Sequence, residues 1–332
     1  MSTIVVERLV KRFGNIVAVD EVSFTVNRGE LFGFLGPNGA GKTTTISILT
    51  TLLKPTFGRA LVGGFDVESE ADKVRRIVGL VPQDITVDDD LTGWENLMLH
   101  AGLYHLDRQE AKRRAREVLE LVNLLDAANR KVETYSGGMR KRLELAAGLM
   151  HHPQILFLDE PTLGLDVQTR TAIWDYVKRL RNELGMTIFL TTHYMDEADT
   201  LCDRIAIIDH GKIRAIDTPT NLKNSLGGDI IELEVTHNNP EEVTTQLGRI
   251  DAVRKTSFVN GVFRVTVERG EETLPVMLEA LLRRGFRVTR VVMKKPTLDE
   301  VFLEYTGRAL REEQGSWEET RRQMAIIRRM RA

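Results

Sequence analysis

The sequence has one cysteine, no long apolar stretch and no excess of charge of either sign, and each shortage excludes a class of protein. Because Cys202 stands alone, no disulfide can form within the chain, which fits a reducing compartment. No apolar run approaches the roughly 20 residues that a membrane-spanning helix needs. Residues 1–4 also lack the basic start and apolar core of a signal peptide. We therefore expect no membrane-spanning helix and no signal peptide in this chain.

The charge balance excludes a second class. The chain carries 46 basic and 48 acidic residues, and its net charge of −2 is too small to imply binding to nucleic acid. Hydrophobic residues make up 42% and charged residues 28%, as in an ordinary globular protein. A length of 332 residues is enough for two domains.

One short stretch indicates what the chain binds. It fits the phosphate-loop pattern G-x-x-x-x-G-K-[ST], and its residues are Gly36, Pro37, Asn38, Gly39, Ala40, Gly41, Lys42 and Thr43. The apolar segment 31–35 predicts a strand before the loop, and the segment from Thr44 to Leu53 predicts a helix after it. Glycines let backbone N–H groups approach phosphate oxygens, and the helix start adds unpaired N–H groups. Lys42 supplies charge to the β- and γ-phosphates, and the Thr43 hydroxyl can bind Mg²⁺. The sequence thus predicts a site for a nucleotide with magnesium.

Two adjacent carboxylates follow an apolar segment further along the chain. Residues 155–158 predict a buried parallel strand, and Asp159 and Glu160 stand at its carboxyl end. Ligands bind at this end of the strands in open α/β sheets. We expect Asp159 to hold Mg²⁺ and Glu160 to orient and deprotonate the attacking water.

The phosphate loop and the two carboxylates make three further segments candidates for the same site. Ser136, Gly137 and Gly138 precede a predicted helix, so they form either a plain helix cap or a second anion site. Gln83 follows an apolar segment at 77–81, and His193 ends a predicted strand at 187–192. Taken alone, such a Gln or His is usually a structural hydrogen-bonding residue, but all of these residues occur in one ordered set.

Together these stretches resemble the nucleotide-binding subunit of ABC transporters over about residues 1–220. The resemblance implies that residues 36–44, ending at Thr44, form the Walker A loop and that Ser136–Gly138 form the signature. It makes Asp159 and Glu160 the end of Walker B, and Leu165 with Asp166 part of the D-loop. Gln83 becomes the Q-loop ligand of magnesium and water, and His193 the switch residue at the γ-phosphate. Phe13 falls where an aromatic ring stacks on adenine, although a plain surface aromatic would look the same.

The signature departs from the common Leu-Ser-Gly-Gly-Gln version. Tyr135 and Met139 replace the leucine and the glutamine, and Met139 cannot donate the hydrogen bonds of a glutamine. This version is similar to the subset that resembles daunorubicin-resistance exporters, so we interpret it as a mark of that subset.

The motifs and the resemblance, together with composition and periodicity, predict three parts. Residues 1–226 form an α/β P-loop NTPase core with an antiparallel β subdomain and a helical insert at about 84–150. Residues 227–307 show the order β-α-β-β-α-β of a ferredoxin-like α+β domain, with an Asn260-Gly261 hairpin. Residues 308–332 form a charged tail that is either a basic amphipathic helix or a solvated segment.

The resemblance implies an ATP-hydrolysing motor subunit of an exporter for a drug, lipid or similar amphiphile. Its partners would be a permease on another polypeptide and a second ATPase subunit, which together place it peripherally on the cytoplasmic side of the membrane. In the resembled family two subunits sandwich ATP between the Walker A loop of one and the signature of the other. The alternative is an ABC ATPase of translation or DNA repair, but one phosphate loop and no sustained heptads argue against it. A regulatory module without hydrolysis is opposed by the intact catalytic residues.

Overall fold

The computed structural model describes residues 2–236 and 239–307, which form two compact units. The division falls between Thr218 and Pro219, rather than after residue 226 as the sequence suggested, because helix α8 (Pro219–Asn224) packs against α11 (Leu298–Thr306). The predicted tail at 308–332 lies outside the described residues. Within those residues, no helix has the length and apolar character needed to cross a bilayer.

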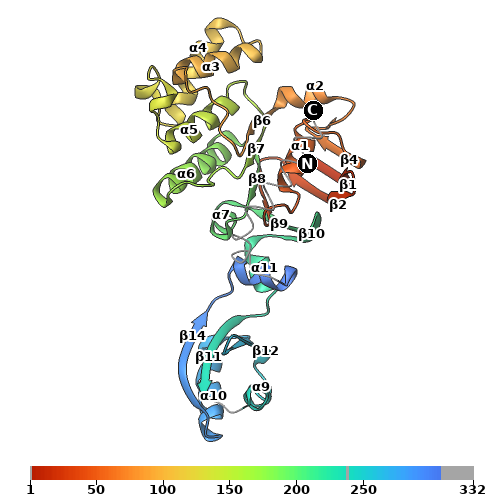
Figure 1. Cartoon of the computed structure of the whole chain (residues 1–332), viewed down its shortest axis with the longest axis vertical. Coiled ribbons are helices and arrows are strands. Elements are labelled where there is room, and N and C mark those ends of the chain that lie inside the picture. The colour runs from red at the N-terminus through yellow and green to blue at the C-terminus, as the bar shows by residue number, and fades with distance from the viewer. Residues whose placement is uncertain (1, 237–238, 308–332) are drawn as a thin grey trace. The chain divides into compact units, whose positions relative to one another are not determined.

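The first unit is built on a six-stranded sheet (Figure 1). Its strands, in spatial order, are β10 (Lys212–Asp217), β9 (Arg204–Asp209), β3 (Leu31–Leu35), β8 (Thr187–Thr192), β7 (Ile155–Asp159) and β6 (Val78–Val81). All neighbours are parallel except β10, which runs antiparallel to β9. Every residue of β3, β7 and β8 is buried, as their continuous apolar runs predict. The parallel strands therefore end at one edge, where the phosphate loop, the two carboxylates and His193 follow them.

A second, antiparallel sheet lies beside the first. It contains β2 (Ile16–Asn27), β1 (Ser2–Phe13), β4 (Phe57–Val62) and β5 (Phe65–Asp66), and confirms the expected antiparallel β subdomain. A cluster of aromatic rings fills the core between the sheets and consists of Phe24, Phe32, Phe34, Phe157 and Phe189. Helix α1 (Lys42–Leu49) contacts β2, β4 and β7, and so lies between the two sheets.

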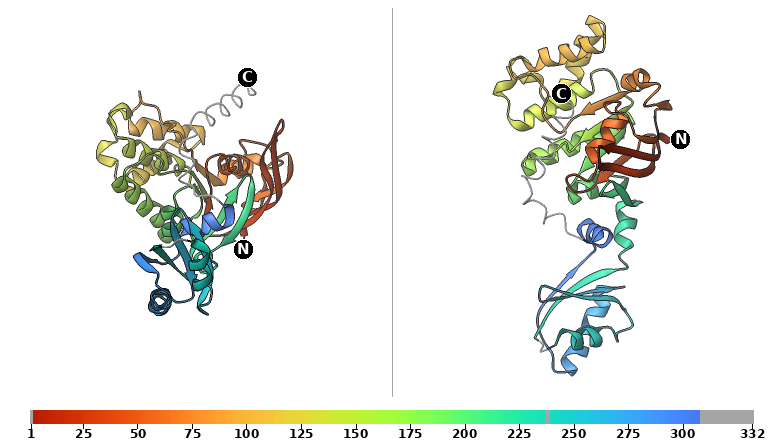
Figure 2. Two further views of the ribbon diagram at one scale, coloured as in Figure 1. Left: turned by 60° about the horizontal axis from the view of Figure 1, so that its bottom comes forward. Right: turned by 45° about the vertical axis from the view of Figure 1, so that its right-hand side comes forward.

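The remaining helices of this unit fall into two groups. The insert comprises α3 (Gly93–Leu103), α4 (Arg108–Leu121), the 3-10 turns Leu125–Ala127 and Val132–Thr134, and α5 (Gly137–Gly148). A capping box of Thr92 and Glu95 begins α3, and Asp107 caps α4. In all three views of Figures 1 and 2 the insert and the antiparallel sheet lie on opposite sides of the central strands. Helices α2 (Ala71–Ile77), α6 (Val167–Leu184) and α7 (Met195–Leu201) complete the unit.

The second unit has the predicted ferredoxin-like arrangement. Its strands β11 (Asp229–Thr236), β12 (Val253–Val259), β13 (Val262–Val267) and β14 (Arg287–Lys294) form an antiparallel sheet in the order β12-β13-β11-β14. Helices α9 (Pro240–Leu247) and α10 (Gly270–Arg283) follow the first and third of these strands. The turn between β12 and β13 has positive φ at both Asn260 and Gly261, as the Asn-Gly signal requires.

Candidate active site

The phosphate loop connects β3 to α1 and leaves amide groups free. Gly41 is the N-cap of α1 and has φ 104°, so the backbone there suits glycine. A Cβ atom on Gly36 would lie 2.3 Å from the Ile208 carbonyl oxygen, which makes the close approach of β9 possible only for glycine. No side chain caps α1, so its first N–H groups have no acceptor from a cap. This uncapped helix start fits a phosphate group.

Lys42 is buried at the centre of the site. Its side chain is 4% exposed, and Nζ donates to the carbonyl oxygens of Gly36 at 2.7 Å and Pro37 at 2.9 Å. The same Nζ lies 3.0 Å from Oε1 of Glu160, which is 5% exposed. The structure thus joins the phosphate loop to the carboxylate end of β7 through one buried ion pair.

The two adjacent acids have opposite electrostatic environments. Burial raises the pKa of Asp159, although hydrogen bonds from Thr191 and Thr43 act against the rise. Burial would also raise the pKa of Glu160, but a hydrogen bond with His193 and the charge of Lys42 outweigh it and lower that pKa to about 2. The pKa values of the two neighbouring acids therefore shift in opposite directions, because Glu160, unlike Asp159, forms the ion pair with Lys42.

Thr191 fixes the geometry of these acids and was missed by the sequence analysis. Its hydroxyl donates to Oδ1 of Asp159 at 2.6 Å and accepts from the Glu160 N–H at 3.1 Å. Glu160 has φ 47°, and its N–H also reaches the Thr191 carbonyl oxygen at 3.1 Å. The signal in the sequence was a pair of hydroxyl residues, Thr191 and Thr192, directly before His193.

His193 follows β8 and approaches the same carboxylate. Its Nδ1 lies 3.1 Å from Oε2 of Glu160, so the glutamate has the lysine on one oxygen and the histidine on the other. The two residues that the sequence predicts for catalysis are in direct contact.

The signature segment lies apart from these contacts, at the start of α5. Ser136 is exposed, and its Oγ accepts from the Met139 N–H at 3.3 Å, which leaves the hydroxyl proton available for an anion. Gly137 is also exposed, and nothing lies within 4 Å of a Cβ atom added there. Gly138 has a packing reason instead, since its added Cβ would lie 2.5 Å from Cγ2 of Thr169.

Gln83 and Phe13 stand at two other edges of the unit. Gln83 is half-buried two residues after β6, and its carbonyl oxygen accepts from Lys141 Nζ at 3.2 Å. Phe13 is half-buried at the end of β1, where Lys11 Nζ lies 5.1 Å from the ring centroid.

Comparison with known proteins decides the family. The family "ABC transporter" matches residues 19–163, and the family "ATP-binding protein DrrA1-3-like, C-terminal domain" matches residues 218–306. The linearmycin resistance ATP-binding protein LnrL of Bacillus subtilis (strain 168) is 41% identical over 92% of this chain and 99% of the relative. The chain belongs to the ATP-binding subunits of ABC transporters. It is an ATPase, and its nucleotide is ATP.

Two further relatives of this ABC ATPase cover most of the chain, and a solved structure covers a smaller part of it. The daunorubicin resistance ATP-binding protein DrrA3 of Streptomyces coeruleorubidus is 42% identical over 92% of the chain and 96% of the relative. The Nod factor export ATP-binding protein I of Sinorhizobium fredii (strain NBRC 101917 / NGR234) is 38% identical over 91% and 85%. A dimeric, post-hydrolysis structure of the ATP-binding cassette MJ0796 with ADP and Pi has 29% identity and a TM-score of 0.59, covering 65% of this chain and 98% of that one. The expected fold and family are confirmed.

The unusual tyrosine of this ABC ATPase signature has a structural role. Tyr135 is 5% exposed, and its hydroxyl donates to the Ala127 carbonyl oxygen at 2.6 Å. A Cβ atom on Gly93 would lie 2.5 Å from the same hydroxyl. Tyr135 thus connects the signature to a 3-10 turn by a hydrogen bond and packs against the start of α3. A leucine at this position could make only apolar contacts.

A buried acid behind the site also escaped the sequence analysis. Glu197 on α7 is fully buried, and its Oε1 accepts from the Thr162 hydroxyl at 2.8 Å and from Trp174 Nε1 at 2.9 Å. It links the segment after Walker B to helix α6. Asp166, expected in the D-loop, caps that helix by accepting from the Thr169 N–H at 2.9 Å.

Proposed function

We propose that this ABC ATPase hydrolyses ATP between two subunits and thereby drives export by a separate membrane permease. The observation that carries the proposal is the contact of Glu160 with both Lys42 and His193 at the carboxyl ends of β7 and β8. In this arrangement a base, a cation and a switch residue meet where the phosphate loop begins.

Glu160 is the proposed general base. In the structure, Lys42 and His193 hold its pKa at about 2, so it is ionised but weakly basic. When the Lys42 amine turns to the phosphates of ATP, the carboxylate loses a positive neighbour and its basicity rises. Glu160 can then take a proton from a water molecule, and His193 can donate its hydrogen bond to the γ-phosphate.

Thr43, Asp159 and Gln83 are the residues that would hold Mg²⁺. Asp159 is 3% exposed, and burial raises its pKa. A hydrogen bond from Thr43 partly opposes this rise, so the two proposed ligands are neighbours. One carboxylate and one hydroxyl, with phosphate oxygens and water, are enough because Mg²⁺ keeps several waters when it binds with a nucleotide. The ion would neutralise charge on the phosphates during transfer.

A second subunit would complete each site. The exposed Ser136 and Gly137, at a helix start with an available hydroxyl proton, support a role in binding the γ-phosphate held by the other subunit. The MJ0796 cassette, which is similar over 65% of this chain, is dimeric with ADP and Pi. In the proposed dimer the phosphate loop of one chain and the signature of the other enclose ATP, while Phe13 stacks on adenine.

The partner in the membrane is a proposed permease that docks on the exposed loop after Gln83. Ile85 in this loop is 44% exposed, and Leu99 and Leu103 on the nearby helix α3 are 52% and 68% exposed. Docking there would hold the ATPase peripherally on the cytoplasmic side of the membrane. Similar proteins are named for linearmycin resistance, daunorubicin resistance and Nod factor export, which supports an amphiphilic cargo. The same names favour transport over roles in translation or DNA repair.

The test is the turnover of Glu160→Gln. Hydrolysis should fall by roughly 10²-fold or more while ATP still binds. Glu30→Gln is the matched control. Glu30 is also a buried glutamate in an ion pair, with Arg204 at 3.2 Å, but it precedes β3, at the end of the strand opposite to the phosphate loop. Near-normal hydrolysis in Glu160→Gln, or an equal loss in Glu30→Gln, would contradict the assignment.

The dimer is tested by sizing the Glu160→Gln protein with and without ATP. ATP should convert monomers to dimers, since the ligand that closes the dimer is not consumed. A monomer under both conditions, also with the membrane partner present, would refute the shared site.

A further inference from the structure

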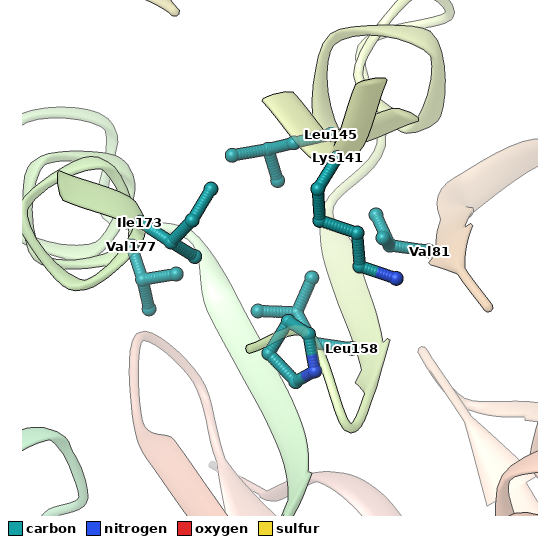
Figure 3. Close-up of a pocket in the computed structure, with 7 residues that line it drawn as sticks. Val81, Lys141, Leu145, Leu158, Ile173 and Val177 are labelled. Carbon is teal, nitrogen blue, oxygen red and sulfur yellow. The ribbon is translucent and has the colours of Figure 1, made fainter. Parts of the chain in front are cut away.

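Two buried charges on the signature helix hold the loop that carries Gln83. Lys141 on α5 is 6% exposed, and its Nζ donates to the carbonyl oxygens of Pro82 at 2.7 Å and Gln83 at 3.2 Å. Figure 3 shows the amine on the side of Val81, directed away from Ile173 and Val177. The apolar cavity beside the lysine measures about 10 Å³, which is too small for a ligand. The lysine therefore acts on the loop and not on a bound molecule.

The second charge lies one turn further along the same helix. Glu144 is 2% exposed, and its carboxylate accepts from the Thr86 N–H at 2.8 Å and 3.0 Å and also from the Thr86 hydroxyl. Lys141 and Glu144 thus form hydrogen bonds with the loop on both sides of Asp84 and Ile85, which remain exposed.

The loop has a further anchor in the helical insert. Asn96 on α3 is 1% exposed, accepts from the Asp88 N–H at 2.8 Å and donates to the Asp88 carbonyl oxygen at 3.0 Å. The 3.3 Å ion pair of Arg140 with Asp89 is more exposed and so adds little. The buried contacts therefore tie the loop to the insert, which also carries the signature.

We propose that Lys141 and Glu144 are positioning residues that make the Gln83 loop and the signature helix move as one body. Moving the loop alone would leave a buried cation and a buried carboxylate without their hydrogen-bond partners, which is strongly unfavourable. A partner that pushes on the exposed Asp84 and Ile85 would therefore displace Ser136 and Gly138 at the start of α5. This inference rests on the proposed function, because it takes that partner to be the permease.

The experiment uses the full chain, alone and reconstituted with its co-purified permease. Lys141→Met removes the two hydrogen bonds to Pro82 and Gln83, and Glu144→Leu removes those from Thr86. The double variant removes both charges, so that neither is left buried alone. Lys141→Arg and Glu144→Gln keep a donor and an acceptor. Arg142→Met is the matched control. Arg142 is also a cation on α5 that donates to backbone carbonyls, but to Val122 at 3.0 Å and Asn123 at 3.3 Å on the other side of the insert, and to Gly138 at 3.4 Å within its own helix, with none to the Gln83 loop among the bonds described.

Two quantities are measured for each variant. The first is amide hydrogen exchange over residues 83–86 of the chain alone, which should speed up by roughly tenfold at Thr86 in Glu144→Leu and in the double variant. The second is the ratio of ATPase activity with and without permease, which should fall by roughly fivefold or more. The control and the two conservative variants should keep that ratio.

Each outcome bears on a different claim. Unchanged exchange at Thr86 would overturn the claim that Lys141 and Glu144 hold the Gln83 loop. Faster exchange with an unchanged activity ratio would overturn their role in coupling. A loss of the ratio in Arg142→Met as well would reduce the effect to general damage and also overturn the role. If the unmodified chain is never stimulated by a permease, the proposed function fails, and the coupling fails with it, whatever the exchange data are.

Discussion

Removing the charge from each of the two adjacent acids should change the stability of the nucleotide-free protein in opposite directions. Asp159 is buried and its pKa is raised, so its charged form is disfavoured in the folded state. Glu160 is equally buried, but Lys42 and His193 lower its pKa to about 2, so its charged form is favoured. Asp159→Asn should therefore stabilise the apo protein at neutral pH, and Glu160→Gln should destabilise it.

The magnitude for Glu160 follows from its pKa. A fall from the ordinary 4.5 to about 2 in a residue that is 5% exposed corresponds to about 3 kcal/mol of stability at neutral pH. Glu160→Gln removes this contribution and leaves Lys42 buried with only its two carbonyl acceptors. We expect its free energy of unfolding to fall by about 3 kcal/mol, a cost typical of breaking a buried ion pair.

The pH dependence separates the two acids further. A lowered pKa contributes stability that is present in full above about pH 4.5 and is lost as the pH falls toward 2, so the Glu160→Gln deficit should be as large at pH 5 as at pH 7.5. A raised pKa has the opposite sign: the penalty on charged Asp159 is present at high pH and disappears as the pH falls through the raised value. The advantage of Asp159→Asn should therefore shrink as the pH is lowered toward the ordinary pKa of an aspartate, whereas the Glu160→Gln deficit persists.

Urea unfolding followed by tryptophan fluorescence measures these differences in the first unit. Trp94 and Trp174 both belong to that unit, and replacing Trp317 by phenylalanine in every variant removes the third fluorophore. Equal stability of Glu160→Gln and the unmodified chain would refute the assigned ion pair. A loss of stability in Asp159→Asn at pH 7.5 would refute the burial penalty.

Three other outcomes are expected. Lys42→Ala should abolish useful ATP affinity in calorimetry, whereas Phe13→Ala should weaken it by only about 1 kcal/mol; equal losses would contradict the division of roles. A mixture of Lys42→Ala and Ser136→Arg chains, each inactive alone, should regain ATPase activity through one intact composite site, and no recovery at any ratio would argue against shared sites. Tyr135→Phe should lower the free energy of unfolding by about 1 kcal/mol in urea, because the buried Ala127 carbonyl loses its donor; an unchanged midpoint would contradict that bond.

The sequence predicts the elements around the site because local signals act over a few residues. The strand at 31–35 and the cap at Ser136 occur as expected. The helix after the phosphate loop was predicted to run to Leu53 but ends at Leu49, because Thr51 has φ 66° and the Leu52 and Leu53 N–H groups both return to the Ser47 carbonyl oxygen. The apolar periodicity continues through this turn, so it gave no sign of the end.

Contacts between distant segments could not be predicted in the same way. Thr191 and Asp159 lie 32 residues apart, and Glu144 and Thr86 lie 58 apart, so only the parallel sheet and the packing of the insert bring them together. Lys141 and Glu144 look like ordinary charges on a helix surface, and their burial depends on the loop after β6. The motif pattern predicts which groups contact the nucleotide, but it does not predict the residues that hold those groups in place.

We propose that the ion pair of Lys42 and Glu160 connects ATP binding to activation of Glu160, the proposed general base. While no phosphate is present, the lysine satisfies the buried carboxylate at 3.0 Å and keeps its pKa at about 2, which makes it a poor proton acceptor. In this proposal, ATP draws the lysine away from this carboxylate, and the same step restores the basicity of Glu160. Breaking the pair would cost free energy and so lower ATP affinity. In return, Glu160 would become a competent base only when its substrate has bound. Glu160→Gln should therefore bind ATP at least as tightly as the unmodified chain, and a tenfold weaker affinity in calorimetry would contradict this exchange of partners.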